Sequence, residues 1–423
     1  MKNVAKKIII SRLNTKVRKL LEHHDVKIIG VTGSIGKTTA KQAIGQVLSA
    51  NRKVRYSLDS YNTDIGIPLS LFGLKVPAKL WDPLAWKKIF TQIDSEIADY
   101  KYDTVVLELA DDEYAMMKKV LRIVKLDIGV ITAIAPVHME FLKDMKTVVH
   151  YNWQTAANAK QVIYNADSAE LRKKAYKTNT VGFGIKYGSV RFGNVTRGKN
   201  GYLNATLKIG KNKHTIHTHM LGVQNLYSLL AAAAVGAELG IPFEAICFEL
   251  SQVKPIAGRM NLLEGIEGSR IIDDSYNASP EAVVSALSTL KELKGRHIAV
   301  LGSMNELGSH STSAHQEVGA QAAKVADLLV TIGKTAEEAL APAAAHSGLK
   351  SEQIKVFRTP YEAGHYVKGI VKKGDIVLVK GSQSGVYSEE ATRILLDPKI
   401  DPADVLVRQS AVWKRRKKKS FAL

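Results

Sequence analysis

Cysteine is nearly absent from this sequence: Cys247 is the only one in 423 residues. A single thiol can form neither an internal disulfide framework nor a cysteine-based zinc site. Long apolar runs are absent as well, because no stretch approaches the roughly 18–20 residues of a membrane-spanning helix. The basic N-terminus has only three apolar residues in a row before Ser11, too few for the hydrophobic region of a secretory signal. We therefore expect a protein of a reducing, cytoplasmic compartment.

Acidic residues are also scarce relative to basic ones. There are 40 Asp and Glu against 60 Lys and Arg, which gives a formal net charge of +20. Such a field suits an anionic substrate, an anionic membrane surface or a nucleic acid. The basic residues are scattered, however, and neither zinc-finger spacing nor an RNA-binding aromatic signature accompanies them. We therefore predict no nucleic-acid partner, and charge alone does not choose between the other two.

Both ends of the chain are basic. Residues 1–25 have apolar side chains near helical spacing and predict a basic amphipathic helix; these side chains are Val4, Ile8, Leu13, Val17, Leu20 and Leu21. Such a helix either packs on the domain that follows or makes peripheral contact with an anionic membrane. Residues 409–423 form a basic tail, whose run Trp413–Lys419 we expect to be disordered.

A glycine-rich loop carries the clearest chemical signal. It lies between a short β-branched stretch, Val26–Val31, and a helical stretch, Lys37–Ala50. Backbone N–H groups at such a helix start cradle phosphate oxygens, the lysine reaches the β- and γ-phosphates, and the next hydroxyl binds Mg²⁺. A strict Walker A motif has glycine where this chain has Val31. The predicted nucleotide-binding residues of the loop are Gly33, Ser34, Ile35, Gly36, Lys37, Thr38 and Thr39.

The rest of the pattern predicts the fold class, which is α/β. Short strands alternate with helices in two blocks, as in mostly parallel sheets that helices cover on both faces. Residues 26–255 are the expected central ATP-binding P-loop domain, with a mostly parallel sheet and a small antiparallel insertion at Val190–His219. Residues 256–408 are the expected C-terminal domain, which is smaller, doubly wound and Rossmann-like.

The loop and a series of later motifs resemble one family. The form Thr-Gly-x-x-Gly-Lys-Thr-Thr is similar to the loops of Mur ligases and folylpolyglutamate synthases. Further motifs follow in the order that Mur ligases have them: Tyr61–Leu69, Leu107–Leu109, Thr132–Glu140, Asn165–Asp167, Phe183–Gly184, Gly222–Asn225, Gly258–Met260, Asp273–Pro280, Leu301–Gly308 and Lys380–Ser382. Turn chemistry explains any one of these motifs but not their shared order. Over roughly residues 26–400, the sequence therefore resembles the Mur ligase family, with Gln224 in place of a usual histidine.

The resemblance implies an ATP-dependent acid–amino-acid ligase that forms a C–N bond and releases ADP. A substrate carboxylate attacks the γ-phosphate to give an acyl phosphate, and an amine then displaces phosphate. The site must hold anions together and stabilise charge on the transferring phosphoryl group. The implied catalytic residues are Lys37, Glu108 and His138, with Thr38 and Glu108 on one Mg²⁺ and His138 on a second. A surface carboxylate or a capping histidine is the plainer interpretation of the last two.

Three more roles are implied for the C-terminal block. Arg259 corresponds to a phosphate contact from across the domain junction, Asp274 to a residue beside the nucleotide, and Asn277 to an adenine contact. Closure of the two domains would then be part of catalysis. An ordinary interdomain ion pair is the plainer interpretation of Arg259.

Within the family, two motifs favour one branch. Asp273–Pro280 and Leu301–Gly308 resemble the branch that adds D-alanyl-D-alanine to a peptidoglycan precursor, so we expect a cell-wall precursor and a similar amine as substrates. A folylpolyglutamate synthase-like ligase is less well matched. An amidotransferase-type relative would carry a four-cysteine zinc ribbon, which one cysteine excludes. A nucleotide-binding scaffold or pseudoenzyme of the same fold is the alternative from another class. We expect a monomer.

Two departures from the family pattern bear on activity. Mur ligases generally carry a carbamylated lysine some 12–14 residues after the metal histidine, and Asn152 stands at that position here. A neutral amide does not replace an anionic carbamate. Either Glu140, Asp144 or His150 compensates, or the second metal is weak, or ligase activity is lost. In addition, only about 25 residues precede the expected ATP domain, so the resemblance does not include the family's N-terminal UDP-binding domain.

Overall fold

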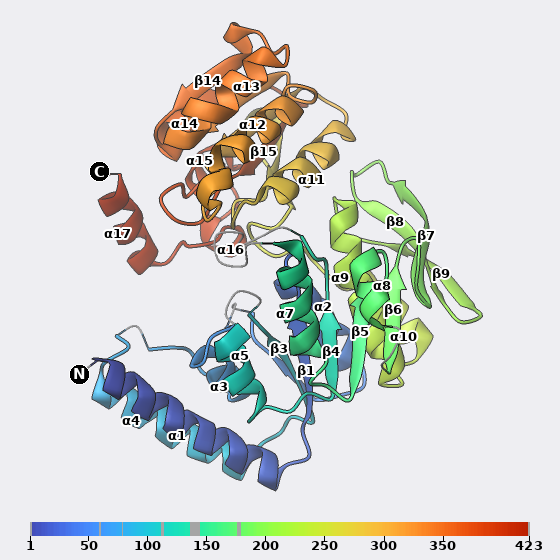
Figure 1. Ribbon diagram of the computed structural model, residues 1–423. Coiled ribbons are helices and arrows are strands. Elements are labelled where there is room, and N and C mark those ends of the chain that lie inside the picture. The colour runs from blue at the N-terminus through green and yellow to red at the C-terminus, as the bar shows by residue number, and fades with distance from the viewer. Residues whose placement is uncertain are drawn as a thin grey trace.

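The computed structural model describes residues 2–58, 61–77, 79–110, 114–135, 144–175 and 179–421, with the side chains of residues 2, 3 and 114 excepted. Two α/β units are stacked, the first in blue to green and the second in yellow to red (Figure 1). Each is built on one sheet, and helices lie on both faces of each sheet. The predicted fold class is confirmed.

The first sheet has the strand order β2-β3-β1-β4-β5-β6-β7-β8-β9. Its pairings are parallel from β2 to β7 and antiparallel from β7 to β9. The antiparallel part confirms the predicted insertion at Val190–His219, which extends the same sheet. The strands are β1 (Lys27–Thr32), β2 (Val54–Tyr56), β3 (Thr104–Glu108), β4 (Ile128–Ile131), β5 (Gln161–Asn165), β6 (Thr180–Gly184), β7 (Val190–Arg197), β8 (Leu203–Ile209) and β9 (Asn212–His217).

Helices bury both faces of this sheet, as the nearly continuous apolar runs of its central strands require. Successive side chains of a strand point to opposite faces, so Ile28 joins one core cluster while Ile29 joins the other. The cluster that contains Ile29 is closed by α2 (Lys37–Ser49), α9 (Val223–Glu238) and α10 (Phe243–Gln252). The opposite cluster is closed by α1 (Lys2–His23), α3 (Gly66–Leu71), α4 (Pro83–Ala98) and α5 (Tyr114–Leu121). A smaller cluster involves α7 (Met145–Ala156) and α8 (Ala169–Ala175).

The second sheet has the order β10-β11-β15-β12-β13-β14, with only the β10–β11 pairing antiparallel. Its strands are β10 (Asn261–Glu264), β11 (Arg270–Asp273), β12 (His297–Gly302), β13 (Leu328–Ile332), β14 (Ile354–Phe357) and β15 (Ile376–Lys380). One face is covered by α11 (Pro280–Lys291), α12 (Ser311–Ala322) and α13 (Ala341–His346), and the other by α14 (Pro360–Lys368) and α15 (Glu389–Leu395). This is a doubly wound arrangement. Short helical turns occupy Ile266–Gly268, Gly308–His310, Ala336–Leu340 and Ser351–Gln353.

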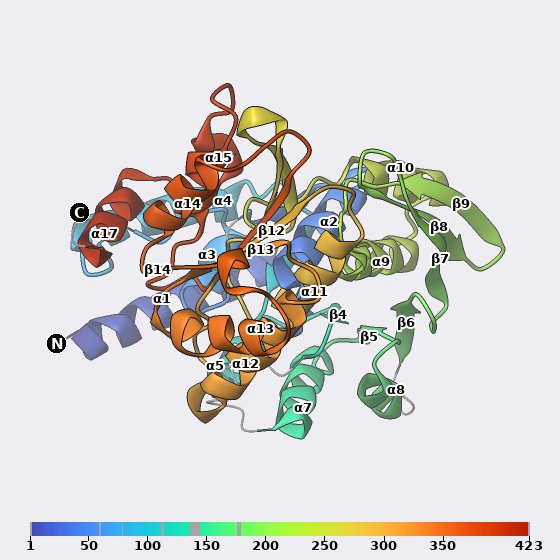
Figure 2. The same ribbon diagram turned by 90° about the horizontal axis from the view of Figure 1, so that it is seen from above.

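The topology of both units gathers loops at one edge of each sheet. Parallel strands end at the same edge, and ligands of open α/β sheets bind there. In the first unit the loops after β1, β3 and β4 share this edge, because β1 is paired with both β3 and β4. In the second unit the loops after β11 and β15 share it, because β11 is paired with β15. The view from above shows the second unit stacked over α2 and the neighbouring strands (Figure 2).

The two chain ends are helical. The middle of α1 packs on the first unit, since Leu13, Val17 and Leu20 are fully buried, whereas Val4 and Ile8 near its start are exposed. Packing on the following domain is therefore the main role of its apolar stripe. No helix in the described part of the chain is both long and apolar enough to cross a bilayer.

The prediction of a disordered C-terminal run was wrong. After the short helix α16 (Pro402–Val405), the chain forms α17 (Ala411–Ser420). Lys417 is buried, and its ammonium group lies 2.9 Å from a carboxylate oxygen of Glu389 and 2.6 Å from one of Glu390. The Trp413 ring also packs edge-on against Tyr387. A buried ion pair and ring contacts hold this basic segment in place.

Candidate active site

The glycine-rich loop has the backbone shape that phosphate loops require. It connects the end of β1 to the start of α2, with φ of 133° at Gly33 and 86° at Gly36, both in the region that favours glycine. A Cβ at Gly33 would lie 2.1 Å from the Thr132 hydroxyl oxygen, so no larger residue fits there. The helix that follows directs its first N–H groups and the positive end of its dipole at the loop. Local sequence and geometry therefore form an anion-binding helix start.

The segment after β4 holds the loop from the side. The amides of Ser34 and Ile35 donate to the carbonyl of Ala133 at 2.8 and 3.2 Å, and the Thr132 hydroxyl donates to the carbonyl of Ile35 at 2.8 Å. The Lys37 ammonium donates to the carbonyl of Gly33 at 2.6 Å, so the lysine folds over the loop. The loop is thus supported by the neighbouring strand, with its lysine above it.

Arg259 of the second unit reaches this loop. Its guanidinium donates to the Thr38 hydroxyl oxygen at 3.2 Å and lies 4.1 Å from the centre of the Tyr276 ring, which orients it by a cation–π contact. Its Nε atom and the Ser34 hydroxyl are buried and have no hydrogen-bond partner in the described part of the chain. Burying two donors without partners costs free energy, and an anionic ligand at this helix start would remove that cost by accepting hydrogen bonds from them. Arg259, Thr38 and the loop therefore form one site at the junction of the two units.

Asp274 organises the facing side of the junction. It follows β11, accepts a hydrogen bond from the Met260 amide at 3.1 Å, and lies 2.6 Å from the ammonium of Lys380 at the end of β15. Lys380 also donates to the carbonyl of Asn277 at 2.9 Å. Burial raises the pKa of Asp274, while Lys380 and Arg259 oppose that shift. Asp274 therefore fixes Lys380, which in turn fixes the loop that carries Asn277, and Arg259 adds a favourable charge nearby.

Asn277 lies at the surface of that loop. Its side-chain oxygen accepts a hydrogen bond from the Gln383 amide at 3.3 Å, so it links the loop after β11 to the loop after β15. Thr39, the last predicted residue of the phosphate loop, is buried in the first turn of α2.

Glu108 ends β3 opposite Val31, as its predicted role requires, but it has an unexpected partner. Its carboxylate lies 3.2 Å from the ammonium of Lys41, and both side chains are almost fully buried. Lys41 stands one helical turn after Thr38 and Lys37, on the same side of α2. The plainer interpretation of Glu108 as a surface carboxylate is excluded by its exposure of 4%.

Of the second predicted metal position, the structure describes only the residues of α7 and its start. His138 and Glu140 lie outside the described residues. Asn152 is fully buried on α7, where its side-chain oxygen accepts from the Thr32 hydroxyl at 2.8 Å and its amide donates to the carbonyl of Val148 at 3.0 Å. Asp144 caps the start of α7 through the Thr147 amide. The polar groups of Asn152 are therefore engaged in holding α7 against the end of β1.

Three residues of the site have no role assigned from the sequence. Lys41 and Lys380 pair with Glu108 and Asp274, and Tyr276 supports Arg259. The sequence does give a signal for the two lysines. Each stands in an otherwise apolar or small-residue segment of a buried element, where a lysine needs an acidic partner. Nothing in the sequence identifies the ring contact.

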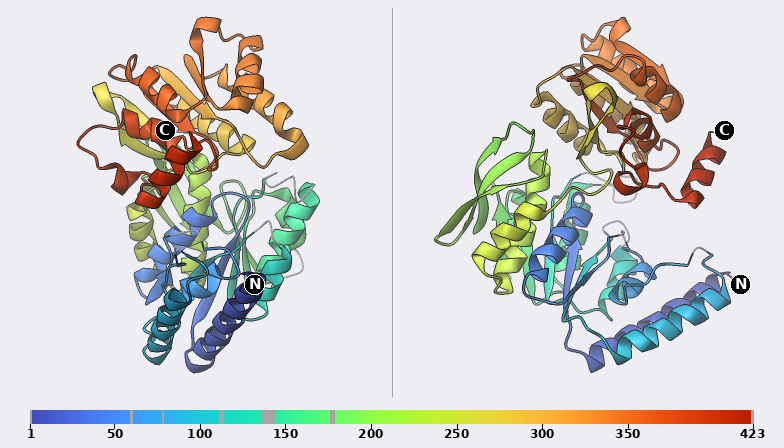
Figure 3. Two further views of the ribbon diagram at one scale, coloured as in Figure 1. Left: turned by 90° about the vertical axis from the view of Figure 1, so that its left-hand side faces the viewer. Right: turned by 180° about the vertical axis from the view of Figure 1, so that it is seen from behind.

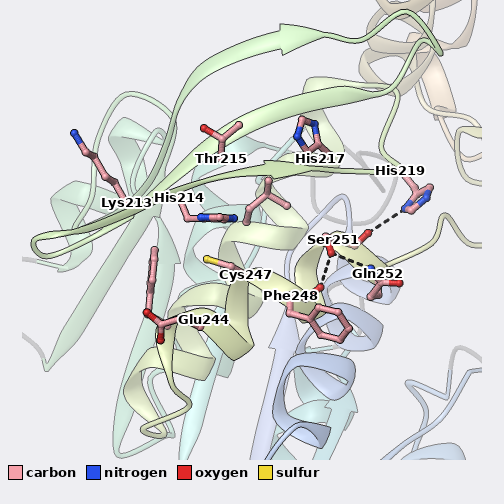
Figure 4. Close-up of a pocket in the computed structure, with 12 residues that line it drawn as sticks. Lys213, His214, Thr215, His217, His219, Glu244, Cys247, Phe248, Ser251 and Gln252 are labelled. Carbon is pink, nitrogen blue, oxygen red and sulfur yellow. Dashed lines mark hydrogen bonds between the residues drawn. The ribbon is translucent and has the colours of Figure 1, made fainter.

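A separate groove of about 550 Å³ lies between β9 and α10. Figure 4 shows its lining, with His214 and Cys247 on opposite walls. A ring nitrogen of His219 is hydrogen-bonded to the carbonyl oxygen of Ser251. None of the predicted site residues lines this groove. We therefore give it no part in the site at the domain junction.

Comparisons with known proteins show which family this chain is similar to. Residues 83–236 match the family described as Mur ligase middle domain, and residues 258–383 match the Mur ligase glutamate ligase domain. The UDP-N-acetylmuramoyl-tripeptide–D-alanyl-D-alanine ligase of Bacillus subtilis is 28% identical over 396 residues, which cover 92% of this chain and 80% of that protein. The crystal structure of MurF ligase from Thermotoga maritima in complex with ADP is 26% identical, with a TM-score of 0.75, and the match covers 91% of this chain and 84% of that one.

Folylpolyglutamate synthase from Mycobacterium tuberculosis is also similar in structure. Its TM-score is 0.65, with 91% of this chain and 96% of that chain covered, but only 15% of residues are identical. That likeness concerns the fold alone.

The fold and the similarity to these enzymes define the class of ATP-dependent ligases that form C–N bonds, here with a P-loop unit and a doubly wound unit that meet at the phosphate loop. Within that class, the chain belongs to the Mur ligase family.

Proposed function

We propose that this protein joins D-alanyl-D-alanine, or a similar amine, to the peptide of a peptidoglycan precursor. A carboxylate oxygen of the precursor attacks the γ-phosphorus of ATP, and the bond from that phosphorus to the β–γ bridging oxygen breaks to release ADP. The amine nitrogen then attacks the acyl phosphate, loses its proton, and phosphate departs. The names of the similar proteins from Bacillus subtilis and Thermotoga maritima support the substrate choice.

One observation carries the proposal: Arg259 from the second unit contacts Thr38 of the phosphate loop. Phosphoryl transfer needs positive charge placed around the transferring group more than it needs a nucleophilic side chain. Lys37 supplies that charge from the first unit and Arg259 from the second. A site assembled from both units forms only when they are together, which couples closure to catalysis.

The residues present also fit Mg²⁺. Thr38 and Glu108 offer oxygen ligands, the donor type that Mg²⁺ prefers, and one or two protein ligands are enough because phosphates and waters complete its shell. Bound there, the ion would neutralise charge on the phosphates. We propose His138 for a second ion, as expected from the family pattern. Lys41 neutralises Glu108 from the protein side.

On the facing side, we propose that Asn277 contacts the adenine and that Asp274 shapes the loop beneath it. The bonds from Asp274 to Lys380 and from Lys380 to the Asn277 carbonyl support this arrangement, because they fix the loop after β11 before nucleotide arrives.

The wider setting of the protein is also proposed. Domain boundaries near residues 26–255 and 256–408 suit the positions of the two sheets. We propose a cytoplasmic monomer that contacts an anionic membrane at its surface and takes no nucleic-acid partner.

The direct test is phosphate release from Mg-ATP with UDP-N-acetylmuramoyl-tripeptide, with and without D-alanyl-D-alanine. We expect release that needs both substrates and that disappears in Lys37→Ala. Arg259→Ala loses a charge-assisted hydrogen bond and a cation–π contact, so we expect kcat/KM to fall about 30- to 300-fold. Glu292→Ala, which removes the ion pair to Arg197 elsewhere at the junction, is the matched control and should change kcat/KM less than about threefold.

A second function, that of a nucleotide-binding scaffold, is favoured by Asn152. Asn152 stands at the position where the family carries a carbamylated lysine, and its side chain is engaged in buried hydrogen bonds. ATP binding that depends on Lys37, without release that depends on the amine, would support the scaffold and contradict the ligase.

A further inference from the structure

Exposed apolar side chains gather at one end of the molecule. In the described part of the chain, five of the eleven large exposed apolar residues lie at the start of α1 or at and before the start of α4: Val4, Ile8, Val76, Trp81 and Leu84. Leu84 is 78% exposed and Val4 is 61% exposed. A concentration of this kind marks an interaction site, whereas scattered single residues do not.

The two helices present these residues together. They run side by side in the same direction, since Arg12 lies over the Phe90 ring and Lys16 pairs with Asp94 further along (Figure 1). Their starting ends therefore lie next to each other. The middle of α1 is already buried against the first unit, so its exposed start is not needed for that packing.

Basic residues surround this apolar group. Its exposed lysines are Lys7, Lys75, Lys79, Lys87 and Lys88. Asp82 is close in sequence, but its side chain caps the start of α4 by accepting from the amides of Leu84 and Ala85. Asp64 pairs with Lys6 of α1 at 3.2 Å. The end of the helix pair thus combines apolar side chains with exposed lysines.

The helix α17 adds a second basic surface. It contains no acidic residue, and its exposed cations are Lys414, Arg415, Arg416, Lys418 and Lys419. Val412, at its start, is 63% exposed. Because Lys417 is buried against Glu389 and Glu390, the helix is fixed and its other basic residues face outward.

Both surfaces lie on the same side of the molecule. The left-hand view in Figure 3 faces this side and shows α17 above and the N-terminal end of α1 below. The view from above also places both chain ends at one side (Figure 2). The β8–β9 hairpin lies at the opposite side (Figure 1).

We propose that these two surfaces together, the starts of α1 and α4 and the exposed face of α17, bind the surface of an anionic lipid bilayer. Basic residues near such a surface each contribute roughly fivefold in affinity, and exposed apolar residues insert shallowly between headgroups. A nucleic acid would use the charge but not the apolar group, so lipid is the better fit. The inference rests on the proposed contact with an anionic membrane, for which it names the binding surfaces, and it does not depend on the ligase reaction.

Vesicle co-sedimentation of the full chain tests the proposal. The probes are vesicles of phosphatidylcholine alone and vesicles with a third of phosphatidylglycerol. We expect binding only to the anionic vesicles, with an affinity that falls as salt rises. Reversal of four charges on α17, in Arg415→Glu, Arg416→Glu, Lys418→Glu and Lys419→Glu together, should weaken binding at least about 100-fold.

The apolar part has its own test. The triple variant Val4→Ser, Ile8→Ser, Leu84→Ser should bind about tenfold more weakly at unchanged charge. Trp81 is 40% exposed, so its fluorescence should shift to shorter wavelength on anionic vesicles, and Trp81→Phe should lose most of that shift.

A matched control uses exposed lysines on the opposite side. The triple variant Lys208→Glu, Lys211→Glu, Lys213→Glu changes a similar charge on the β8–β9 hairpin and should bind vesicles within about threefold of the unmodified chain. Thermal unfolding of every variant verifies that the fold is kept. Equal loss in this control and in the α17 variant would overturn the proposal, because net charge alone would then explain binding. The proposal would also be overturned if duplex DNA displaced the vesicles and the apolar triple variant bound the vesicles normally.

Discussion

Replacement of Lys41 by methionine should destabilise the first unit more than any surface substitution. Lys41 and Glu108 face each other at 3.2 Å with side-chain exposures of 1% and 3%. Methionine keeps the length and apolar stem of lysine but removes the charge. The Glu108 carboxylate then stays in a buried position without its cation.

The expected cost follows from that burial. Removing one partner of a buried ion pair costs about 3–5 kcal/mol, because the remaining charge is uncompensated. For a unit of this size each kcal/mol lowers the melting temperature by roughly 2–4 °C, so a decrease of about 6–20 °C is expected. A surface pair such as Lys101 with Asp99 should change stability by less than about 1 kcal/mol.

The assay is urea unfolding followed by tryptophan fluorescence. A chain of two units can unfold in more than one step, so the signal must come from one of them. Trp86 and Trp153 are buried in the first unit, and Trp413→Phe removes the tryptophan of α17 from the signal. The single variant, Lys41→Met, is compared with the double variant that also carries Glu108→Leu.

The double variant decides whether the reasoning holds. Two apolar residues in place of the pair remove the uncompensated charge, so most of the lost free energy of unfolding should return. If the double variant is no more stable than Lys41→Met, the loss comes from packing rather than charge. A loss below about 1 kcal/mol in the single variant would equally refute the argument.

Three further predictions concern the loop and two buried polar residues. Gly33→Ala should cost about 2–6 kcal/mol and abolish ATP binding, because its Cβ would lie 2.1 Å from the Thr132 hydroxyl oxygen. The control Gly240→Ala is also at positive φ but has open space around it, so it should cost only about 1–2 kcal/mol in the same unfolding assay. Burial raises the pKa of Asp273 to about 6, so the native state keeps a proton that the unfolded state loses near pH 4. Its contribution, about 3 kcal/mol, should be present below pH 4 and disappear as the pH rises to about 6, a slope that Asp273→Asn should lack in urea unfolding at a series of pH values. Asn152→Ala should lower the free energy of unfolding by about 1–3 kcal/mol, and a change below 0.5 kcal/mol would show that its buried hydrogen bonds contribute nothing.

Most elements could be predicted from the sequence because their signals are local. The strand that ends in Thr32, the loop and α2 follow from β-branched residues, glycines and helical spacing within 25 residues of one another. The resemblance to the Mur ligase family then predicted that Arg259 and Thr38 contribute to the same site, although the two residues are far apart in the sequence. Local pattern alone gives no reason to place them together.

The partners of buried charges could not be predicted in the same way. Lys41 faces Glu108 because β3 lies beside β1 in the sheet, and strand order is a property of the whole topology. The same holds for Lys380 and Asp274, which meet because β15 is paired with β11. Sequence shows that each lysine needs an acid, but the sheet decides which one.

The C-terminal basic run shows how far a charge pattern can mislead. Six cations in succession repel one another and predict a solvated, disordered segment. Glu389 and Glu390, however, are themselves buried, and Arg408 pairs with Glu389 from another direction. Glu390 pairs with Arg393 of its own helix through one carboxylate oxygen, and its other oxygen accepts from Lys417 of α17, 27 residues later in the sequence. Once that one lysine is held, helical geometry sets the direction of its neighbours. One cation of the run thus stabilises the second unit, while the others face outward as a fixed positive surface.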